Sequence, residues 1–361
     1  MLALKTIAYV LGAFGIVGTV VPFLNYDDWW IRGFDYPRQQ LIVILGVAAL
    51  CWMISDASLA GYHYPLLVLL ILAMFYQAYR ILPYTPLWSR DARPAQQTSD
   101  EDRHLSLLIS NVLQTNREYH RIIELVRQYQ PDIFLAVETD QAWVDVLDRE
   151  LGPVYPHTVP VPLDNLYGMA LYSRLPLEDT RVTYRIKDDI PGIDSRVTLD
   201  CGQTIQLHFV HPMPPSPTEA YASTGRDAEL ALVGQEVSQR GGTAIVAGDL
   251  NDVAWSHSTR LFQRLSGMVD PRRGRGLYST FHADHRFARW PLDHVFLTPD
   301  LAIVNMERLP HVGSDHFPIF IRVSYEPAKD EGQAEHPEGD DHREAAETIA
   351  AGKRGEDQSV C

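Results

Sequence analysis

Two short acidic motifs carry the side chains of this chain that are best suited to chemistry. They span Gly248–Asn251 and Gly313–His316, and each lies where an apolar stretch gives way to a loop. Before the first motif, the short apolar run Thr243–Ala247 is typical of a buried strand that delivers Asp249 to its carboxyl end. Carboxylate, amide and imidazole groups at strand ends can bind a cation and move protons, so the motifs indicate metal-dependent phosphoryl hydrolysis.

Other polar residues follow the remaining predicted strands in the same way. In chain order the set is Asn111, Glu138, His211, Asp249 with Asn251, Asp293, and Asp315 with His316. One acidic residue after one strand is usually structural, but recurrence at the ends of successive strands indicates a shared site. The set contains no thiolate and suits an oxygen-preferring cation, Mg²⁺ or Mn²⁺. Such cations bind phosphate oxygens and stabilise charge on a leaving oxygen.

The elements that must position these residues begin near His104, where strand-length apolar runs start to alternate with helical spacing. The predicted helices are Tyr119–Tyr129 and about Glu219–Gln239. The predicted strands are Leu105–Val112, Ile133–Val137, Met169–Tyr172, Arg196–Leu199, Ile205–Val210, Ala244–Ala247, His294–Leu297, Ile303–Met306 and Phe317–Val323. So many strands with so few helices favour two packed sheets with helices outside over a doubly wound sheet.

Taken in order, the motifs resemble those of the endonuclease/exonuclease/phosphatase superfamily, which includes DNase I, apurinic endonucleases, sphingomyelinases and inositol polyphosphate phosphatases. The resemblance is to a membrane-anchored, bacterial-type member and covers about residues 104–324. It rests on Ser110–Val112, Val137–Thr139, Gly168–Leu177, His211, Gly248–Asn251, Leu292–Phe296 and Ser314–His316. It implies an α/β fold, a four-layer α/β sandwich of two packed mixed β-sheets flanked by helices, which agrees with the independent strand pattern.

The resemblance also implies which residues hold the metal. Glu138 would be the principal ligand. The Asn111 amide would support that carboxylate or bind the hydration shell of the ion, and Asp315 would bind on the metal side, directly or through water. The cofactor would be Mg²⁺ or Mn²⁺.

For the reacting groups, the resemblance implies a one-step attack by water without a covalent intermediate. Asp249 would orient and deprotonate the water, and Asn251 would hold water or phosphate in line. His316 would donate to a phosphoryl oxygen while Asp293 keeps it cationic. His211 would contact the scissile phosphate. His294 departs from the pattern, because relatives usually carry an aromatic residue there, and a direct role for it is not expected.

The first hundred residues differ in kind from the rest. The charge-free runs Ile7–Leu24, Gln39–Ser55 and Ala57–Tyr79 have 18, 17 and 23 residues, close to the ~20 that a helix needs to cross a bilayer. They predict a membrane region, residues 1–82, with three transmembrane helices at about 6–24, 39–56 and 62–82. Aromatic residues at their margins are typical of an interfacial belt: Trp29, Trp30, Tyr36, Tyr62 and Tyr64.

The predicted localisation is an integral membrane protein of the inner or plasma membrane. Three spans put the N-terminus and the large domain on opposite sides. Counting positive charges favours a cytoplasmic domain, whereas a large domain after an N-terminal anchor is also a common extracytoplasmic arrangement. The side that the domain faces therefore stays open.

Composition divides the remaining chain. Residues 83–103 are rich in Pro, Gln, Asp and Arg and predict a linker before a catalytic domain at 104–325. Of the formal charge of −15, residues 326–361 contribute 11 acidic and 4 basic residues, a net −7. This polar tail is predicted to be disordered. The chain has no basic footprint of a high-affinity duplex binder, although an enzyme with a small substrate footprint would not need one.

Two alternatives stay in view. Gly248–Asp252 also fits the GDxxD motif of calcineurin-like metallophosphoesterases, but the matching DxH at Asp102–His104 precedes its strand and no later GNHD or GNHE follows. The other alternative is a membrane-anchored binding module that has lost catalysis, although every expected polar residue type is present. No protein partner can be inferred.

The substrate is predicted only as a class. A phosphodiester, or a phosphomonoester, is expected, in nucleic acid or in a lipid head group, which makes the chain endonuclease-like or a phospholipid phosphodiesterase. Membrane tethering suits both, and the fold does not choose between them. The proline-rich residues 212–217 after His211 predict a stiff loop beside the site or a simple connection to the next helix.

Overall fold

Two mixed sheets dominate the computed structural model, which describes residues 2–24, 26–55, 64–96, 100–327 and 334–355. The first sheet has the strand order β10 (Leu301–Arg308), β11 (Ile319–Tyr325), β1 (His104–Asn111), β2 (Ile133–Val137), β4 (Met169–Ser173) and β3 (His157–Val161). The second has the order β5 (Glu178–Thr183), β6 (Gly192–Thr198), β7 (Thr204–Phe209), β8 (Ala244–Asp249) and β9 (Asp293–Leu297). Each sheet contains one parallel pair, β1 with β2 and β7 with β8.

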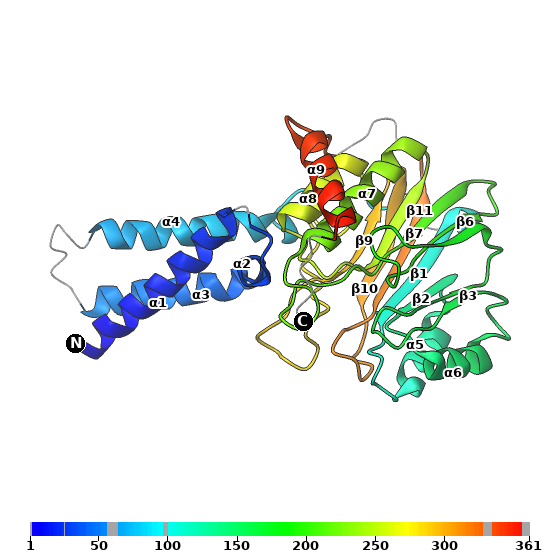
Figure 1. Cartoon of the computed structure of the whole chain (residues 1–361), viewed down its shortest axis with the longest axis horizontal. Helices are drawn as coiled ribbons and strands as arrows, with labels where there is room; N and C mark the ends of the chain where they lie inside the picture. Colours follow the sequence, from blue (N-terminus) through cyan, green and yellow to red (C-terminus); the bar gives the residue numbers. More distant parts are fainter. Residues whose placement is uncertain (1, 25, 56–63, 97–99, 328–333, 356–361) are drawn as a thin grey trace.

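The two sheets pack face to face with helices outside (Figure 1). Along β1, Leu107 points into the core between the sheets, whereas Leu108 packs under α5 (Tyr119–Tyr129) and α6 (Gln141–Leu151). The outer face of the second sheet is covered by α7 (Thr224–Arg240) and α8 (His257–Ser266). The predicted four-layer α/β sandwich is confirmed.

The predicted elements differ from the structure mainly at the edges of the sheets. The strands β3 and β5 were not predicted, because both are edge strands without a run of buried apolar residues. The helices α6 and α8 were also not predicted, although Asp140 and Ser256 cap their first turns by accepting from Trp143 N and Thr259 N. Short helical turns complete the chain: η1 (Val21–Phe23), α2 (Trp29–Arg32), η2 (Gly33–Asp35), η3 (Leu82–Tyr84) and η4 (Glu101–Arg103).

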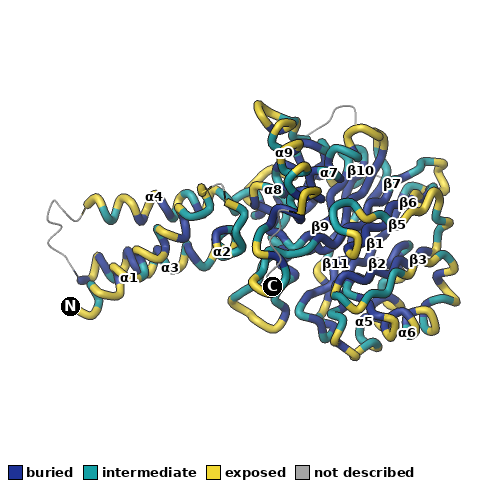
Figure 2. Tube along the Cα trace, in the orientation of Figure 1, coloured by how far each residue is buried: buried dark blue, intermediate teal, exposed yellow. Residues whose placement is uncertain are grey.

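Three N-terminal helices form a bundle beside the sandwich (Figure 1): α1 (Leu2–Val20), α3 (Arg38–Ser55) and α4 (Tyr64–Ile81). The helix α3 by itself is long and apolar enough to cross a membrane. The same is true of α1 and α4, each taken together with the short turn that follows it. Their outward faces are largely exposed, in contrast to the buried strands of the sandwich (Figure 2). A ring of exposed apolar residues around a bundle is the pattern expected of helices surrounded by lipid. Part of the predicted third span lies outside the described residues, which resume at Tyr64.

The segment between the bundle and β1 is held against the sandwich. Pro94 pairs with Ile303 of β10, and the backbone of Arg93 accepts from Ile303 N at 2.8 Å. Ala92 is buried in the core between the sheets. The predicted linker is therefore a fixed connection over its described part rather than a loose tether.

The acidic tail was predicted to be disordered, and for Asp341–Lys353 this is wrong. These residues form α9, which packs on α7 and α8 (Figure 1). Arg264 of α8 donates to both carboxylate oxygens of Asp341, at 2.6 and 2.9 Å. The prediction failed because α9 docks mainly through small residues, among them the buried Ala345 and Gly352, and offers only Ile349 of the large apolar residues that mark a core-facing helix.

Candidate active site

The parallel pairs of the two sheets bring their carboxyl ends to one place. The end of β1 carries Asn111, and Glu138 follows β2 directly. On the second sheet, His211 follows β7 and Asp249 ends β8. Polar side chains from both sheets therefore meet at one edge of the sandwich, as their places after predicted strands had indicated.

The amide of Asn111 connects the two sheets. Its Nδ2 donates to Glu138 Oε1 at 2.7 Å and to Asp249 Oδ2 at 3.1 Å. Its Oδ1 accepts from the backbone N of Leu113 at 3.0 Å, which fixes the orientation of the amide. The backbone N of Gln114 lies 3.3 Å from the second oxygen of Glu138. Asn111 thus holds two carboxylates in place at once.

His316 lies between two buried aspartates. Its Nδ1 is 2.7 Å from Asp293 Oδ2, and its Nε2 is 3.5 Å from Asp249 Oδ2. Burial lowers the pKa of His316, but the charges of Asp249 and Asp293 outweigh burial and raise it to about 10. Burial opposes ionisation of Asp249, yet His316, His211 and the Asn111 hydrogen bond together lower its pKa. The pair is therefore an imidazolium beside a carboxylate at neutral pH.

His211 and Asn251 complete the cluster. The Nε2 of His211 lies 4.0 Å from Asp249 Oδ2, and burial lowers the pKa of His211 to about 4, so the ring is neutral. Its Nδ1 is buried without a hydrogen-bond partner among the described residues. The backbone N of Asn251 donates to Asp249 at 3.0 Å, and its side chain donates to Pro212 O at 3.0 Å.

The backbone around these groups adopts conformations that few residues favour. Glu138 has a φ of +62° and Asn251 a φ of +52°. At Gly248, with a φ of +146°, an added Cβ would lie 1.9 Å from the carbonyl oxygen of Val210. The two strands can approach this closely only because the residue before Asp249 has no side chain.

The residues around Glu138 fit a hard cation. Glu138 and Asp315 both line the same cavity. Burial raises the pKa of Glu138 to about 7 against the Asn111 hydrogen bond, and the nearby charge of Asp315 adds to the increase. These two carboxylates are oxygen donors of the kind that a divalent cation prefers, and the Asn111 amide, which donates to both Glu138 and Asp249, holds Glu138 in place. Asp249, Asp293 and His316 also have metal-compatible spacing, with ligand atoms within 4.8 Å of one another.

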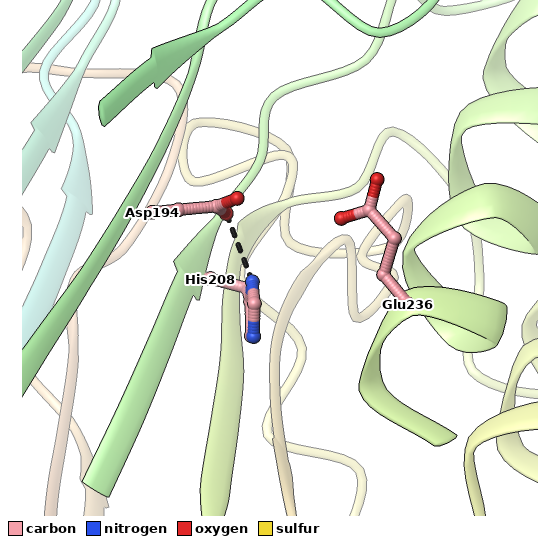
Figure 3. Close-up of side chains that lie close together, drawn as sticks. All are labelled: Asp194, His208 and Glu236. Atoms are coloured by element: carbon pink, nitrogen blue, oxygen red, sulfur yellow. Dashed lines mark hydrogen bonds and ion pairs between the residues drawn. The ribbon is translucent and has the colours of Figure 1, made fainter. Parts of the chain in front are cut away.

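A second group with metal-compatible spacing lies away from this site. Figure 3 shows Asp194 of β6, His208 of β7 and Glu236 of α7. Here a positive charge is already supplied by the chain, because Arg185 donates to Asp194 at 2.7 Å and to Glu236 at 3.0 Å. The group is therefore a buried ion-pair network and not a second metal centre.

A cavity of about 800 Å³ opens over the cluster. Of the predicted site residues, Glu138, His211, Asn251, Asp315 and His316 line it, while Asn111, Asp249 and Asp293 lie behind them. The proline-rich loop also contributes to the wall through Pro214 and Pro215.

Sequence reasoning missed much of the cavity wall. Trp29, Gly33, Tyr36 and Pro37, between the first two apolar helices, line the cavity together with Trp290 and other residues of the sandwich. From the sequence alone, the aromatic residues of this segment indicate only an interfacial belt. The clustering of aromatic residues before Pro37 is the one signal that the sequence offers. It does not indicate which distant residues these side chains contact.

Comparisons with known proteins agree with this fold. The family model described as "Endonuclease/Exonuclease/phosphatase family" matches residues 106–316, a range that includes all the predicted site residues. A search of curated proteins finds no significant match.

Solved structures show the same fold. A humanized form of D. rerio TDP2 superposes with a TM-score of 0.51 at 17% identity, covering 62% of this chain and 99% of that one. An endonuclease/exonuclease/phosphatase from Bacteroides vulgatus gives 0.50 at 17%, covering 62% and 99%. A family protein from Bacteroides thetaiotaomicron gives 0.51 at 17%, covering 62% and 98%. At this identity the likeness concerns the fold alone.

Proposed function

Since the chain belongs to the endonuclease/exonuclease/phosphatase family, we propose that it is a metal-dependent hydrolase of phosphodiester bonds, tethered to a membrane by its N-terminal helices. The observation that carries the proposal is the arrangement of His316 between Asp249 and Asp293 at the base of the cavity that Glu138 and Asp315 line. Attack of water on a phosphate ester needs three kinds of group: a proton-donating imidazolium, an ionised carboxylate, and a pair of carboxylates that can bind a cation.

In this proposal each of the chain's own groups has one task. Asp249, kept ionised by its neighbours, accepts a hydrogen bond from the attacking water and takes its proton as the water oxygen bonds to phosphorus. His316 donates from Nε2 to a phosphoryl oxygen as negative charge accumulates there. Asp293 accepts from Nδ1 and keeps the ring oriented.

His211 and Asn251 position the phosphate. The neutral His211 ring faces the cavity beside Asp249 and can donate to a phosphoryl oxygen. Asn251 lies at the cavity wall, held by Asp249 and Pro212. A divalent cation held by Glu138, Asn111 and Asp315 would neutralise charge on the phosphate.

Nucleic acid is one candidate substrate, beside a lipid diester. The structure of D. rerio TDP2 in complex with a single strand DNA product shares this fold at 17% identity and a TM-score of 0.50. For this chain, DNA must therefore be assayed beside lipid diesters and a phosphomonoester.

The proposed function is tested with the purified full chain in detergent and the small soluble diester bis(p-nitrophenyl) phosphate. We expect turnover with Mg²⁺ or Mn²⁺, loss of turnover with EDTA, and recovery when the cation is restored. Absence of turnover on this diester, on DNA and on lipid, with a cooperative unfolding transition retained, would favour the inactive binding module.

A further inference from the structure

One wall of the catalytic cavity comes from the membrane region. Trp29, Gly33, Tyr36 and Pro37 line the cavity together with the catalytic residues. These four residues, referred to here as the juxtamembrane wall, lie between α1 and α3. The site is therefore complete only when the bundle and the sandwich are both present.

The juxtamembrane wall is fixed to the catalytic residues by direct contacts. Tyr36 donates through its hydroxyl to the backbone carbonyl of Asn251 at 2.9 Å. Its ring meets Trp290 edge to face, with centroids 5.8 Å apart. Trp29 N donates to Tyr221 O at 2.8 Å, in the loop that leads into α7. The wall is thus held directly against the catalytic loops.

The neighbouring side chain Arg226, from α7, contacts the same catalytic loop as Tyr36. It is almost fully buried and donates to the carbonyl of Asn251 at 2.9 Å, the group that Tyr36 also contacts. In addition, Ser223 N donates to Asp27 O at 2.8 Å. Contacts at both ends of the wall therefore hold the membrane segment against the active site.

The juxtamembrane wall lies next to the ends of two apolar helices. Pro37 directly precedes Arg38, the first residue of α3, and η1 after α1 ends at Phe23. In Figure 1 this segment lies at the end of the bundle that faces the sandwich. If the helices span a bilayer, the cavity opens at the bilayer surface. Tyr26 and Trp30, which are 62% and 45% exposed, flank it there as interfacial aromatics.

The lining of the cavity combines polar and apolar side chains. Its polar residues include Glu138, Asp315 and His316, and its apolar residues include Leu113, Leu166, Phe281 and Leu292. No Lys or Arg occurs among the described residues that line it. An anionic polymer is held mainly by Lys and Arg contacts to its phosphates, whereas a cavity that combines phosphate-binding groups with many apolar side chains suits an amphiphile.

We propose that the substrate is a phosphodiester lipid of the bilayer that holds α1, α3 and α4. This inference rests on the hydrolase function proposed above and names its substrate class. The phosphate lies at His316, and the apolar part of the lipid lies along the juxtamembrane wall. A water oxygen bonds to phosphorus and one phosphorus–oxygen ester bond breaks. The water proton passes to Asp249, and the displaced oxygen takes up a proton from solvent water. The products are an alcohol and a phosphomonoester, and Asp249 then returns its proton to solvent.

The first test uses the full chain reconstituted into vesicles with Mn²⁺. Three substrates are compared: phospholipids with zwitterionic or anionic head groups in the vesicle, bis(p-nitrophenyl) phosphate, and single-stranded DNA. We expect kcat/KM to be highest for a vesicle phospholipid. Cleavage of the soluble diester or DNA without cleavage of any lipid overturns this inference and leaves the hydrolase function standing. Absence of all turnover contradicts the hydrolase function itself.

The second test changes the juxtamembrane wall. Replacing Trp29 with Ala removes apolar contact area, and we expect the ratio of lipid turnover to soluble-diester turnover to fall about tenfold. Trp88→Ala is the matched control, because Trp88 is exposed, lies in the segment before β1 and does not line the cavity. An unchanged ratio in Trp29→Ala, or an equal decrease in Trp88→Ala, contradicts the proposal.

A third variant, Gly33→Leu, tests the same wall independently, so that the inference can still be tested if Trp29→Ala does not fold. Gly33 has a helical φ of −57°, and a Cβ added there meets no atom within 4 Å. Gly33→Leu should therefore fold and narrow the cavity from the membrane side. We expect a lower lipid-to-diester turnover ratio, again about tenfold. A folded Gly33→Leu protein with the wild-type ratio also contradicts the inference.

Discussion

The side-chain amide of Asn111, at the end of β1 in one sheet, donates at 3.1 Å to the carboxylate of Asp249, at the end of β8 in the other sheet. The same amide nitrogen donates to Glu138 at 2.7 Å. One neutral donor therefore sets the distance between the group proposed to bind metal and the group proposed to orient water. Its position depends on how the two sheets pack, so packing of the sandwich and geometry of the site are coupled.

Replacing Asn111 with Ala should reduce activity by loosening both carboxylates. We expect kcat to fall about 10- to 100-fold and half-maximal activity to require more Mg²⁺, since groups that orient ligands have effects of this size. A magnesium titration of diester hydrolysis measures both. Asn305→Ala, at an exposed position on β10, is the control and should retain the wild-type titration. An unchanged metal requirement in Asn111→Ala would contradict the proposed role of Asn111 in positioning the two carboxylates.

His316→Gln and Asp249→Asn should each lower kcat by about 10²- to 10⁴-fold, because each removes a charge proposed to act in the transition state. Both replacements keep the approximate shape of the side chain, and a thermal unfolding curve checks the fold. His285→Gln, in an exposed loop, is the matched control. Either site variant turning over near the wild-type rate would remove that residue from the mechanism.

The elements that the sequence predicts best are those with a buried face. Tyr119–Tyr129 and Ile133–Val137 have the predicted bounds, because helical spacing and a continuous apolar run are local signals. The strand β5 has no such run and lies at an edge, exposed along most of its length. Its pairing with β6 depends on neighbours that no local pattern reveals.

The same distinction applies to the site. The proximity of Asn111, Glu138 and Asp249 could be predicted because each follows or ends a recognisable strand, and the parallel pairs bring those ends together. Tyr36 could not, since its contact with Asn251 joins residues 215 positions apart in the chain. The docking of α9 was missed for a related reason: the helix contacts its neighbours mainly through the small residues Ala345 and Gly352, with Ile349 as its single large apolar residue.

The buried network in Figure 3 predicts a specific response of stability to pH. Burial opposes ionisation of Asp194, but the His208 hydrogen bond and the Arg185 charge lower its pKa from 3.8 to about 2. A carboxylate whose pKa is lower in the folded state stabilises the fold fully above its ordinary pKa, and this contribution is lost as pH falls from 3.8 towards 2.

Asp194→Asn should therefore be less stable than the wild type at pH 6, by about 3 kcal/mol, because Arg185 is left buried without this partner. The difference should shrink as the pH falls through the window between 3.8 and about 2. Denaturant unfolding of the full chain in detergent, followed across this range, measures it. Asp179→Asn, at an exposed neighbouring strand position, is the control. A stability difference that does not change with pH would contradict the prediction.

Gly352→Val should separate α9 from α7. A Cβ added at Gly352 would lie 2.4 Å from the Cβ of Ala228, and neither atom belongs to a flexible side chain that could move aside. We expect faster amide hydrogen exchange in 341–353 and in the part of α7 beneath it, because both lose their packing partner. Ala346→Val, on the exposed side of the same helix, adds similar bulk without this clash and should retain slow exchange. Equal exchange in the two variants would mean that the ion pair between Arg264 and Asp341 holds α9 without close helix packing.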